Sequence, residues 1–464
     1  MVAESTPAAR DPAPHDAPAM LETIELNGED SAPSARARSA KNDQKMASKD
    51  LENGDAKSLN GPDDAAEQAP RHAASDERTF VNAIIAFLGS GILGLPYAFR
   101  KTGIVYGLAT LVAVAAVSTY AMLLVVECKY KLKTRGITIT TYGDIGFHAM
   151  GRAGRVLVDT AIVVSQAGFC VAYLIFIVTN AHQFLGVDKA LVVSVCAPPL
   201  IAFSLLRHMK ELAYVALAAD VMNFVGLAVV YTADLSFMAQ RDASSIEVLG
   251  VVSSIPFFFG VASYCFEGVG MVLPLENGME HPTHFKSILI CTVIIITTLY
   301  ATFGICGYLA FGDTTLDVVT LNLTDDSGLL SLVKLCLCAG LFFAYPIMMF
   351  PVFQILEPLV ASARSSDAPV PRVTQNQKIV MMKSVVVVTT AALAVGIPNF
   401  GQFISFIGST CCTLLAFVLP SCFHLMLFPR ETSWPKAVLL AALIALGVAA
   451  VVAAVADTGK KIFG

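Results

Sequence analysis

The chain has 464 residues, of which 55% are hydrophobic and 14% are charged, whereas soluble globular proteins are about 45–50% apolar and about 25% charged. The net charge of −5 argues against a nucleic-acid-binding protein, and the eleven cysteines fall within or at the ends of apolar stretches rather than in polar loops, which argues against a disulfide-rich secreted module. The composition excludes a soluble enzyme and indicates a polytopic membrane protein.

Residues 1–78 differ from the rest of the chain. They hold nine Lys/Arg and sixteen Asp/Glu residues, almost no aromatic residues and no apolar periodicity. Such a segment cannot bury enough apolar area to offset the entropy cost of ordering. We therefore expect residues 1–78 to form a disordered cytosolic tail, and no apolar core of a signal peptide follows the initiator methionine.

From Thr79 onward, long apolar stretches follow one another, and eleven of them approach or exceed the roughly 20 residues that span a bilayer as a helix. They are continuously apolar rather than alternating, which excludes the strands of a membrane barrel. We predict an all-α polytopic membrane protein with about eleven transmembrane helices and a transport domain over residues 79–456. The stretches are 79–98, 103–127, 155–180, 190–206, 212–237, 248–274, 286–311, 329–356, 379–397, 401–428 and 435–456.

The basic residues of the short loops predict the orientation. With the N-terminus in the cytosol, the cytosolic loops carry fifteen Lys/Arg residues and the opposite side carries six, as the positive-inside rule requires. Residues 457–464 are then a short non-cytosolic C-terminal tail. The sequon Asn322-Leu323-Thr324 also falls on the non-cytosolic side, so Asn322 is a candidate glycosylation site.

Two of the predicted spans contain residues that interrupt helices. The first span holds Gly89-Ser90-Gly91 followed by Gly94 and Pro96, and the sixth holds Phe266-Glu267-Gly268 followed by Gly270 and Pro274. Broken helix is tolerated in a membrane only where it lines a cavity. Interrupted spans at matching positions of two five-helix halves predict an inverted-repeat transporter with a site at the midplane. The alternative is that these glycines only permit close helix packing.

These motifs carry a family resemblance. The run Gly-Ser-Gly-Ile-Leu-Gly-Leu-Pro-Tyr-Ala-Phe from Gly89 resembles the first helix of the amino acid/auxin permease family. Residues 266–277 resemble its sixth helix, 166–173 its third and 340–351 its eighth, and the branch that is most similar contains the proton-coupled and vacuolar neutral amino-acid transporters. The resemblance implies an eleven-helix, LeuT-like fold with a 5+5 inverted repeat, and export or symport of free amino acids.

The broken spans and the resemblance together define a candidate substrate site. Unwound backbone exposes N–H groups that favour a carboxylate, and aromatic hydroxyls at a buried site commonly bind a ligand oxygen. A single tyrosine on an apolar helix can equally serve packing alone. The candidate substrate-binding residues are Gly89, Ser90, Gly91, Ile92, Tyr173, Phe266, Gly268 and Tyr345.

Ionisable residues inside the spans are the candidates for ion coupling, because each costs roughly 2.5–3.5 kcal/mol at the membrane centre. Glu267, in the sixth-span break, is the first choice: it could carry a proton or bind the substrate ammonium, or simply hold the kink. Asp220 of the fifth span is the second, since that span borders the cation site in the fold class by resemblance, although an interhelical hydrogen bond would also explain it. We expect Asp234, which is nearer a span end, to be solvated.

The leading hypothesis is a secondary active transporter for small neutral amino acids, coupled to protons, without a cofactor or bound metal, in a vacuolar or lysosomal membrane. The plasma membrane is the alternative location. The animal proton-coupled members of the family carry a histidine where this chain has Asn82, so no histidine relay is implied and a sodium-coupled carrier remains a second reading. A third is an amino-acid-sensing receptor whose acidic tail recruits a cytosolic partner. The sequence contains no HExxH, GxSxG or P-loop motif, which argues against a membrane enzyme.

Overall fold

The computed structural model describes residues 74–206, 209–240, 246–323, 328–362 and 372–463. Most of the predicted tail, residues 1–73, lies outside these ranges. Within them the chain is built from helices, with one isolated bridge between Ala74 and Met279. The last helix continues to Phe463, so the residues expected to form a C-terminal tail extend that helix.

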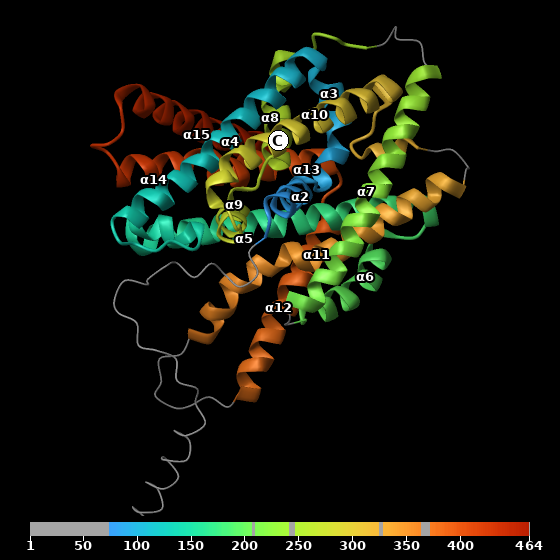
Figure 1. Cartoon of the computed structure of the whole chain (residues 1–464). Coiled ribbons are helices and arrows are strands. Elements are labelled where there is room, and N and C mark those ends of the chain that lie inside the picture. The colour runs from blue at the N-terminus through green and yellow to red at the C-terminus, as the bar shows by residue number, and fades with distance from the viewer. Residues whose placement is uncertain (1–73, 207–208, 241–245, 324–327, 363–371, 464) are drawn as a thin grey trace, which may run out of the picture. The chain divides into compact units, whose positions relative to one another are not determined.

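Each predicted apolar stretch coincides with a helical segment. Figure 1 shows these segments coloured from blue to red in chain order. The first stretch is divided into three pieces and the sixth into two. In chain order the main elements are α2 (Asp76–Phe87), η1 (Ser90–Gly94), α3 (Leu95–Thr102), α4 (Ile104–Thr134), α5 (Tyr142–Leu185), α6 (Lys189–Ser204), α7 (Met209–Gln240), α8 (Ile255–Cys265), α9 (Val269–Asn277), α10 (Phe285–Phe311), α11 (Gly328–Ser362), α12 (Arg372–Gly396), α13 (Phe400–Ile407), η7 (Gly408–Cys412), η8 (Leu414–Val418), α14 (Leu419–Leu427) and α15 (Trp434–Phe463).

The lengths of these helices agree with membrane crossing. Among the described residues, nine helices are long and apolar enough to span a bilayer, and the bent pair formed by α2 and the following segment makes ten. The fourth predicted stretch is α6, a shorter apolar helix of 16 residues. At 1.5 Å per residue α6 is about 24 Å long, somewhat less than the roughly 30 Å of the hydrocarbon core.

Side chains and glycines fix where the helices begin and end. The Thr141 hydroxyl and the Asp144 carboxylate form a capping box that starts α5, and Asn399 caps α13 by accepting from the Gln402 N–H. Gly103, with φ +83°, ends α3 where its backbone meets that of Gly250. A side chain at either glycine would collide with the other residue's backbone, so only glycine fits this turn.

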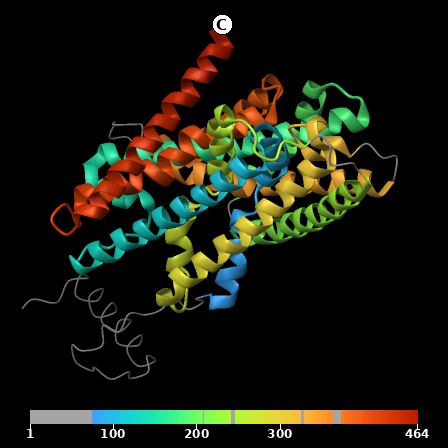
Figure 2. The ribbon, with the colours of Figure 1, turned by 90° about the horizontal axis from the view of Figure 1, so that it is seen from above.

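The helices that matter for function pack around the two interrupted spans. Helix α10 contacts α2, α3, α4 and α7; α8 contacts α3, α4 and α13; and α7 runs along α11. The C-terminal helix α15, red in Figure 2, lies against α14 and η8. Helices α8 and α10 also contact η1, one of the segments where regular α-helix is lost.

Both predicted breaks are present. In the first span α2 stops at Phe87 and η1 begins at Ser90, and the two halves of the span are bent by 42°. In the sixth span α8 stops at Cys265 and α9 starts at Val269, which leaves three residues of non-helical backbone between them.

A further irregularity lies in the tenth span. The segments η7 and η8 are π-helical turns inserted between α13 and α14. Gly408, at the start of η7, is so close to the Gly260 carbonyl of α8 that a Cβ would approach the carbonyl oxygen to 1.8 Å. Such π-turns often occur at functional sites, and this one contacts the first half of the broken sixth span.

Candidate functional site

A hydrogen bond joins the two broken spans. The Ser90 hydroxyl of η1 lies 3.0 Å from the Tyr264 hydroxyl near the end of α8. Both side chains are buried, with exposed fractions of 1% and 5%. The break in the first span and the break in the sixth are therefore adjacent, as the inverted-repeat prediction requires.

A second tyrosine joins the same breaks from α10. The Tyr300 hydroxyl donates to the Phe87 carbonyl at the end of α2 and lies 3.4 Å from the Cys265 carbonyl at the end of α8. One side chain thus contacts the C-terminal ends of both half-helices. Phe266 packs edge-on against the Tyr300 ring, with the ring centroids 5.4 Å apart.

The exposed backbone at the breaks has two polarities. The first N–H groups of η1, at Ser90 and Gly91, have no partner within that helix, because a 3-10 helix bonds each N–H to the third residue before it and its first bond reaches back to the N-cap residue Gly89. The C-terminal ends of α2 and α8 present carbonyls instead. Helix N-termini favour anions and C-termini favour cations. This arrangement suits a zwitterion, whose carboxylate and ammonium groups are close together.

The glycines of the breaks differ in the space around them. A Cβ on Gly91 would lie 2.6 Å from the Cys265 Sγ and 2.9 Å from the Tyr264 ring. A Cβ on Gly268 would lie 2.7 Å from the Phe87 ring, whereas on Gly89 it would meet only the Tyr173 hydroxyl, at 3.9 Å. The breaks are therefore closely packed in this conformation, with the most space at Gly89.

Glu267 lies in the gap between α8 and α9 and is 9% exposed. Its carboxylate accepts a hydrogen bond from the Gly270 N–H, in the first turn of α9, and it lies near Tyr142 of α5 and Cys412 of η7. The carboxylate therefore caps the N-terminus of α9. This geometry fits both readings of the sequence, a titratable group and a group that holds the kink.

Asp220 of α7 lies beside the first break. Together with Asn223 it lines a small hollow against Leu88, the residue that follows α2. Asp220 lies near Tyr173. Asn223 lies against Gly340 of α11, where its buried Oδ1 has no hydrogen-bond partner among the residues that the structure describes. Polar atoms from α7 thus face the junction of the first and eighth spans.

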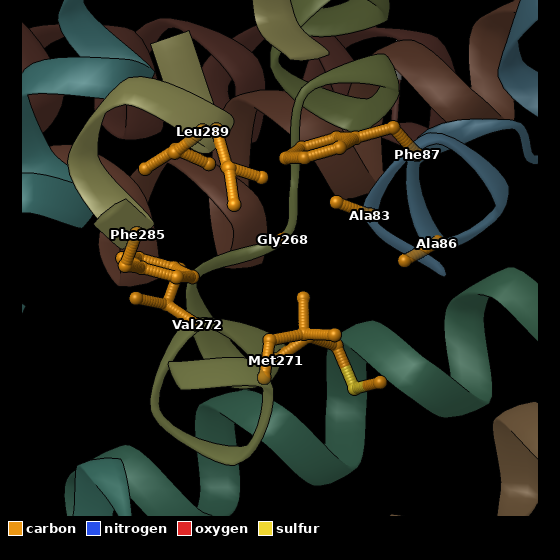
Figure 3. Close-up of a pocket in the computed structure, with 10 residues that line it drawn as sticks. Ala83, Ala86, Phe87, Gly268, Met271, Val272, Phe285 and Leu289 are labelled. Atoms are coloured by element: carbon orange, nitrogen blue, oxygen red, sulfur yellow. The ribbon is translucent and has the colours of Figure 1, made fainter. Parts of the chain in front are cut away.

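Another hollow, shown in Figure 3, lies between α2, α9 and α10. Ala83, Phe87, Gly268, Met271 and Leu289 are among its lining residues. The lining is apolar and offers no partner for the charged groups of an amino acid. We therefore place the candidate substrate site at the Ser90–Tyr264 pair and not in this hollow.

Three predicted residues lie elsewhere. The Tyr345 hydroxyl is 2.6 Å from the Thr390 hydroxyl of α12, so it is engaged on a different helix pair. Asn322 uses its side-chain amide within the loop after α10, donating to the Thr314 carbonyl at 2.8 Å. The expectation that Asp234 is solvated was wrong, because Asp234 is 0% exposed.

Two tyrosines that join the breaks were not selected from the sequence. Tyr264 lies two residues before the Phe266-Glu267-Gly268 motif, so proximity to the break was an available signal. Tyr300 lies in a plain apolar span with no motif around it, and only the packing of α10 against both breaks reveals its position. Across the described ranges, no three His, Cys, Asp or Glu side chains gather as a metal site would require.

The chain also matches known proteins over most of its length. Residues 72–459 match the family model described as transmembrane amino acid transporter protein. The chain is 38% identical over 396 residues to the amino acid transporter AVT3B of Arabidopsis thaliana, covering 82% of this chain and 91% of that protein. It is 28% identical to vacuolar amino acid transporter 3 of Saccharomyces cerevisiae, covering 76% of this chain and 52% of that protein.

The structure also resembles solved transporters. The inward-facing conformation of Mhp1 superposes with a TM-score of 0.55 at 12% identity, covering 88% of this chain and 96% of that chain. Mhp1 has the LeuT fold, so this likeness confirms the predicted fold class.

Proposed function

Because the chain belongs to the transmembrane amino acid transporter family, we propose that it moves small neutral amino acids across a vacuolar membrane by alternating access, driven by a proton gradient. The observation that carries this proposal is the junction of the two breaks at Ser90 and Tyr264. Backbone N–H groups and helix-end carbonyls meet there, and they complement the two charged groups that all free amino acids share.

The side chains around this junction favour a neutral substrate. Ser90, Tyr173, Tyr264 and Tyr300 contribute hydroxyls, and Cys265 contributes a thiol. A charged substrate side chain would need an opposite charge to offset its desolvation, and these neutral groups do not supply one. Small substrates fit best because the glycine-rich breaks are closely packed.

Proton coupling rests on Glu267. It is a buried carboxyl located between the two halves of the sixth span, and a buried acid can alternate between neutral and charged forms as its surroundings open to water. Asp220, beside the first break, is the alternative proton site. Sodium coupling would instead use backbone and amide oxygens near Asn223 and Gly340, since sodium requires several oxygen ligands.

The experiment is uptake of a panel of radiolabelled amino acids into proteoliposomes, with and without an imposed pH gradient or sodium gradient. Small neutral amino acids should accumulate when protons flow down their gradient. Glu267→Gln mimics the protonated form and should exchange substrate across the membrane without accumulating it. Accumulation that follows sodium alone would refute proton coupling. Retained pH-driven accumulation by Glu267→Gln would move the proton site to another acid such as Asp220, or to no side chain at all.

The vacuolar location is supported by the relatives named vacuolar transporters. With the N-terminus in the cytosol, Asn322 would face the lumen and Lys378 of α12 would face the cytosol. Cysteines introduced singly at these two positions should react with membrane-impermeant reagents from opposite sides. Labelling of position 322 from the cytosolic side would refute this orientation.

A further inference from the structure

Asp234 of α7 is a buried acid that the proposed substrate site does not use. It is 0% exposed, and neither carboxylate oxygen has a hydrogen-bond partner in the described part of the chain. It lies fourteen residues after Asp220, about 21 Å further along the helix. Asp234 is therefore well separated from the first-span break, on the side where α3 and the end of α10 lie.

Its surroundings are apolar. Tyr231, one turn before Asp234, stacks on Phe303 of α10, with ring centroids 6.1 Å apart. Phe237, one turn after it, contacts Phe311 of α10 at 5.6 Å. Asp234 thus lies between two aromatic pairs at the interface of α7 and α10. Burying an unpaired carboxylate charge in such a site costs far more than burying the neutral acid.

Asp234 also borders α3, the second half of the first span. Gly307 of α10 lies between Asp234 and Pro96 of α3, because a Cβ there would be 3.2 Å from the Asp234 Oδ2 and 2.7 Å from the Pro96 ring. Helix α3 directly follows Ser90 and Gly91 of the candidate site. Any movement of α3 that opens the site also changes what covers Asp234.

Among the residues that the structure describes, the other ionisable groups near Asp234 supply no counter-charge. On α10 the Cys306 thiol, which bonds Tyr231, is a titratable group near Asp234, and as a neutral thiol it supplies no charge. The charged and titratable side chains that α3, α10 and α11 present towards this end of the bundle are engaged with other partners. These are Arg100 with the Thr315 carbonyl, Lys101 with the Tyr97 ring, Tyr308 with the Glu247 N–H, and Lys334 with Gln183.

We propose that Asp234 is a second proton-binding group, on the non-cytosolic side of the transport pathway. When α3 moves away from α10, water reaches Asp234 and the acid equilibrates with that water: it releases its proton to water at high pH, and at low pH the carboxylate takes a proton back from hydronium. Because the closed interface offers no counter-charge, α3 closes over the neutral acid, and closing therefore depends on the pH of that compartment. This proposal rests on the proposed proton-driven transport, and it adds a proton site that is distinct from Glu267.

Infrared difference spectroscopy on the purified full chain in lipid tests the site without any substrate. The spectrum of the wild-type protein at about pH 7, after subtraction of the Asp234→Asn spectrum, should show the carbonyl band of a protonated carboxylic acid. Subtraction of the spectrum of the control Asp313→Asn, which replaces an exposed acid after α10, should not show this band. A carboxylate band in the first difference spectrum would overturn the proposal. Because no transport is measured, this result stands even if the protein proves not to be proton-driven.

A second experiment tests the role of Asp234 in transport. It measures exchange of radiolabelled alanine in proteoliposomes while the pH on the non-cytosolic side is varied from about 5 to about 8. Asp234→Asn should lose the dependence of exchange on that pH, while Asp313→Asn and Asp234→Glu, which keeps a titratable acid, should retain it. Recovery in Asp234→Glu would exclude a simple folding defect. An unchanged pH profile in a folded Asp234→Asn would overturn the proposal, whatever Glu267→Gln does.

Discussion

The hydroxyls of Ser90 and Tyr264 lie 3.0 Å apart and join the broken first span to the broken sixth. A buried hydrogen bond of this kind contributes about 0.5–1.5 kcal/mol net. We expect Ser90→Ala and Tyr264→Phe each to raise the KM for alanine by up to about tenfold, with little change in delivery to the membrane.

A double-mutant cycle tests whether the two hydroxyls act together. If they act through their mutual bond, the double variant should lose little more than either single variant, because the second substitution removes an interaction already lost. Thr410→Ala provides a control, since its hydroxyl bonds carbonyls of its own helix at the Phe406 turn. Strict additivity of Ser90→Ala and Tyr264→Phe would show that they contribute independently.

Gly91 should be intolerant of any side chain. A Cβ at this position would come within 2.6 Å of the Cys265 Sγ, so Gly91→Ala should force the two breaks apart, lower the thermal midpoint of the purified protein and abolish uptake. Gly270→Ala, where a Cβ meets nothing within 4 Å, is the matched control and should leave both properties near wild type.

The two readouts separate packing from substrate contact at Gly91. A loss of uptake together with a lower midpoint assigns the glycine to packing of η1 against α8. A loss of uptake with an unchanged midpoint assigns it to the approach of the substrate carboxylate. Normal uptake by Gly91→Ala would contradict the site placed here.

The ion pair between Lys129 and Glu276 holds the end of α9 to α4. Glu276 is 1% exposed and also accepts from the Tyr130 hydroxyl at 2.5 Å. Removing one partner of a buried pair costs about 3–5 kcal/mol, because the other charge is left uncompensated. Glu276→Ala should therefore lower the unfolding midpoint strongly, and Glu280→Ala, an exposed acid four residues later, should not. Equal midpoints for the two variants would contradict this account.

Much of this fold could be predicted from the sequence because its strongest signals are local. Continuous apolar stretches define the spans, and Gly89, Gly91 and Gly268 mark the breaks, since glycine weakens a helix wherever it occurs. The fold class and the transporter family were confirmed by the comparisons. The positions of individual substrate contacts stay predictions.

The remaining features depend on contacts between distant segments. Tyr300 contacts both breaks only because α10 packs beside them, and the pairing of Tyr345 with Thr390 depends on how α11 meets α12. Asp234 was expected to be solvated from its position near a span end. It is buried because Gly307 lets α3 and α7 approach the same face of α10, a three-helix arrangement that no single stretch reveals.

Glu431, in the turn between α14 and α15, provides a control for the pH measurements. Hydrogen bonds from Arg135 and then Lys131 lower the pKa of this exposed carboxyl below its ordinary value. The contribution of the Glu431 carboxylate to the free energy of unfolding is therefore complete above about pH 4.3. It is lost only as the pH falls through the lowered pKa that this carboxyl has in the folded protein. Glu431→Gln should leave the transport pH profile between about pH 5 and about pH 7 unchanged. A shift in that profile would mean that this turn takes part in coupling.

The last prediction concerns the segment that precedes α2. The Ala74 N–H donates to the Gly278 carbonyl at 2.8 Å, and the Ala74 carbonyl accepts from the Glu280 N–H at 3.0 Å. Two residues later, Asp76 lies 2.6 Å from His284. These contacts join the start of the first span to the loop between α9 and α10, so they link the two spans that must move during transport.

Removing residues 1–70 preserves all of these contacts, and we expect the truncated protein to take up amino acids at the wild-type rate. Ala74→Pro in the full-length chain removes the N–H that bonds Gly278, and it should change the uptake rate and lower the thermal midpoint, while Ala74→Gly, which keeps that N–H, should have a smaller effect. Parallel uptake and stability measurements on the three proteins decide between two roles for the N-terminal region. Loss of uptake on removing residues 1–70 would instead favour the receptor hypothesis, in which the acidic tail is essential because it recruits a partner.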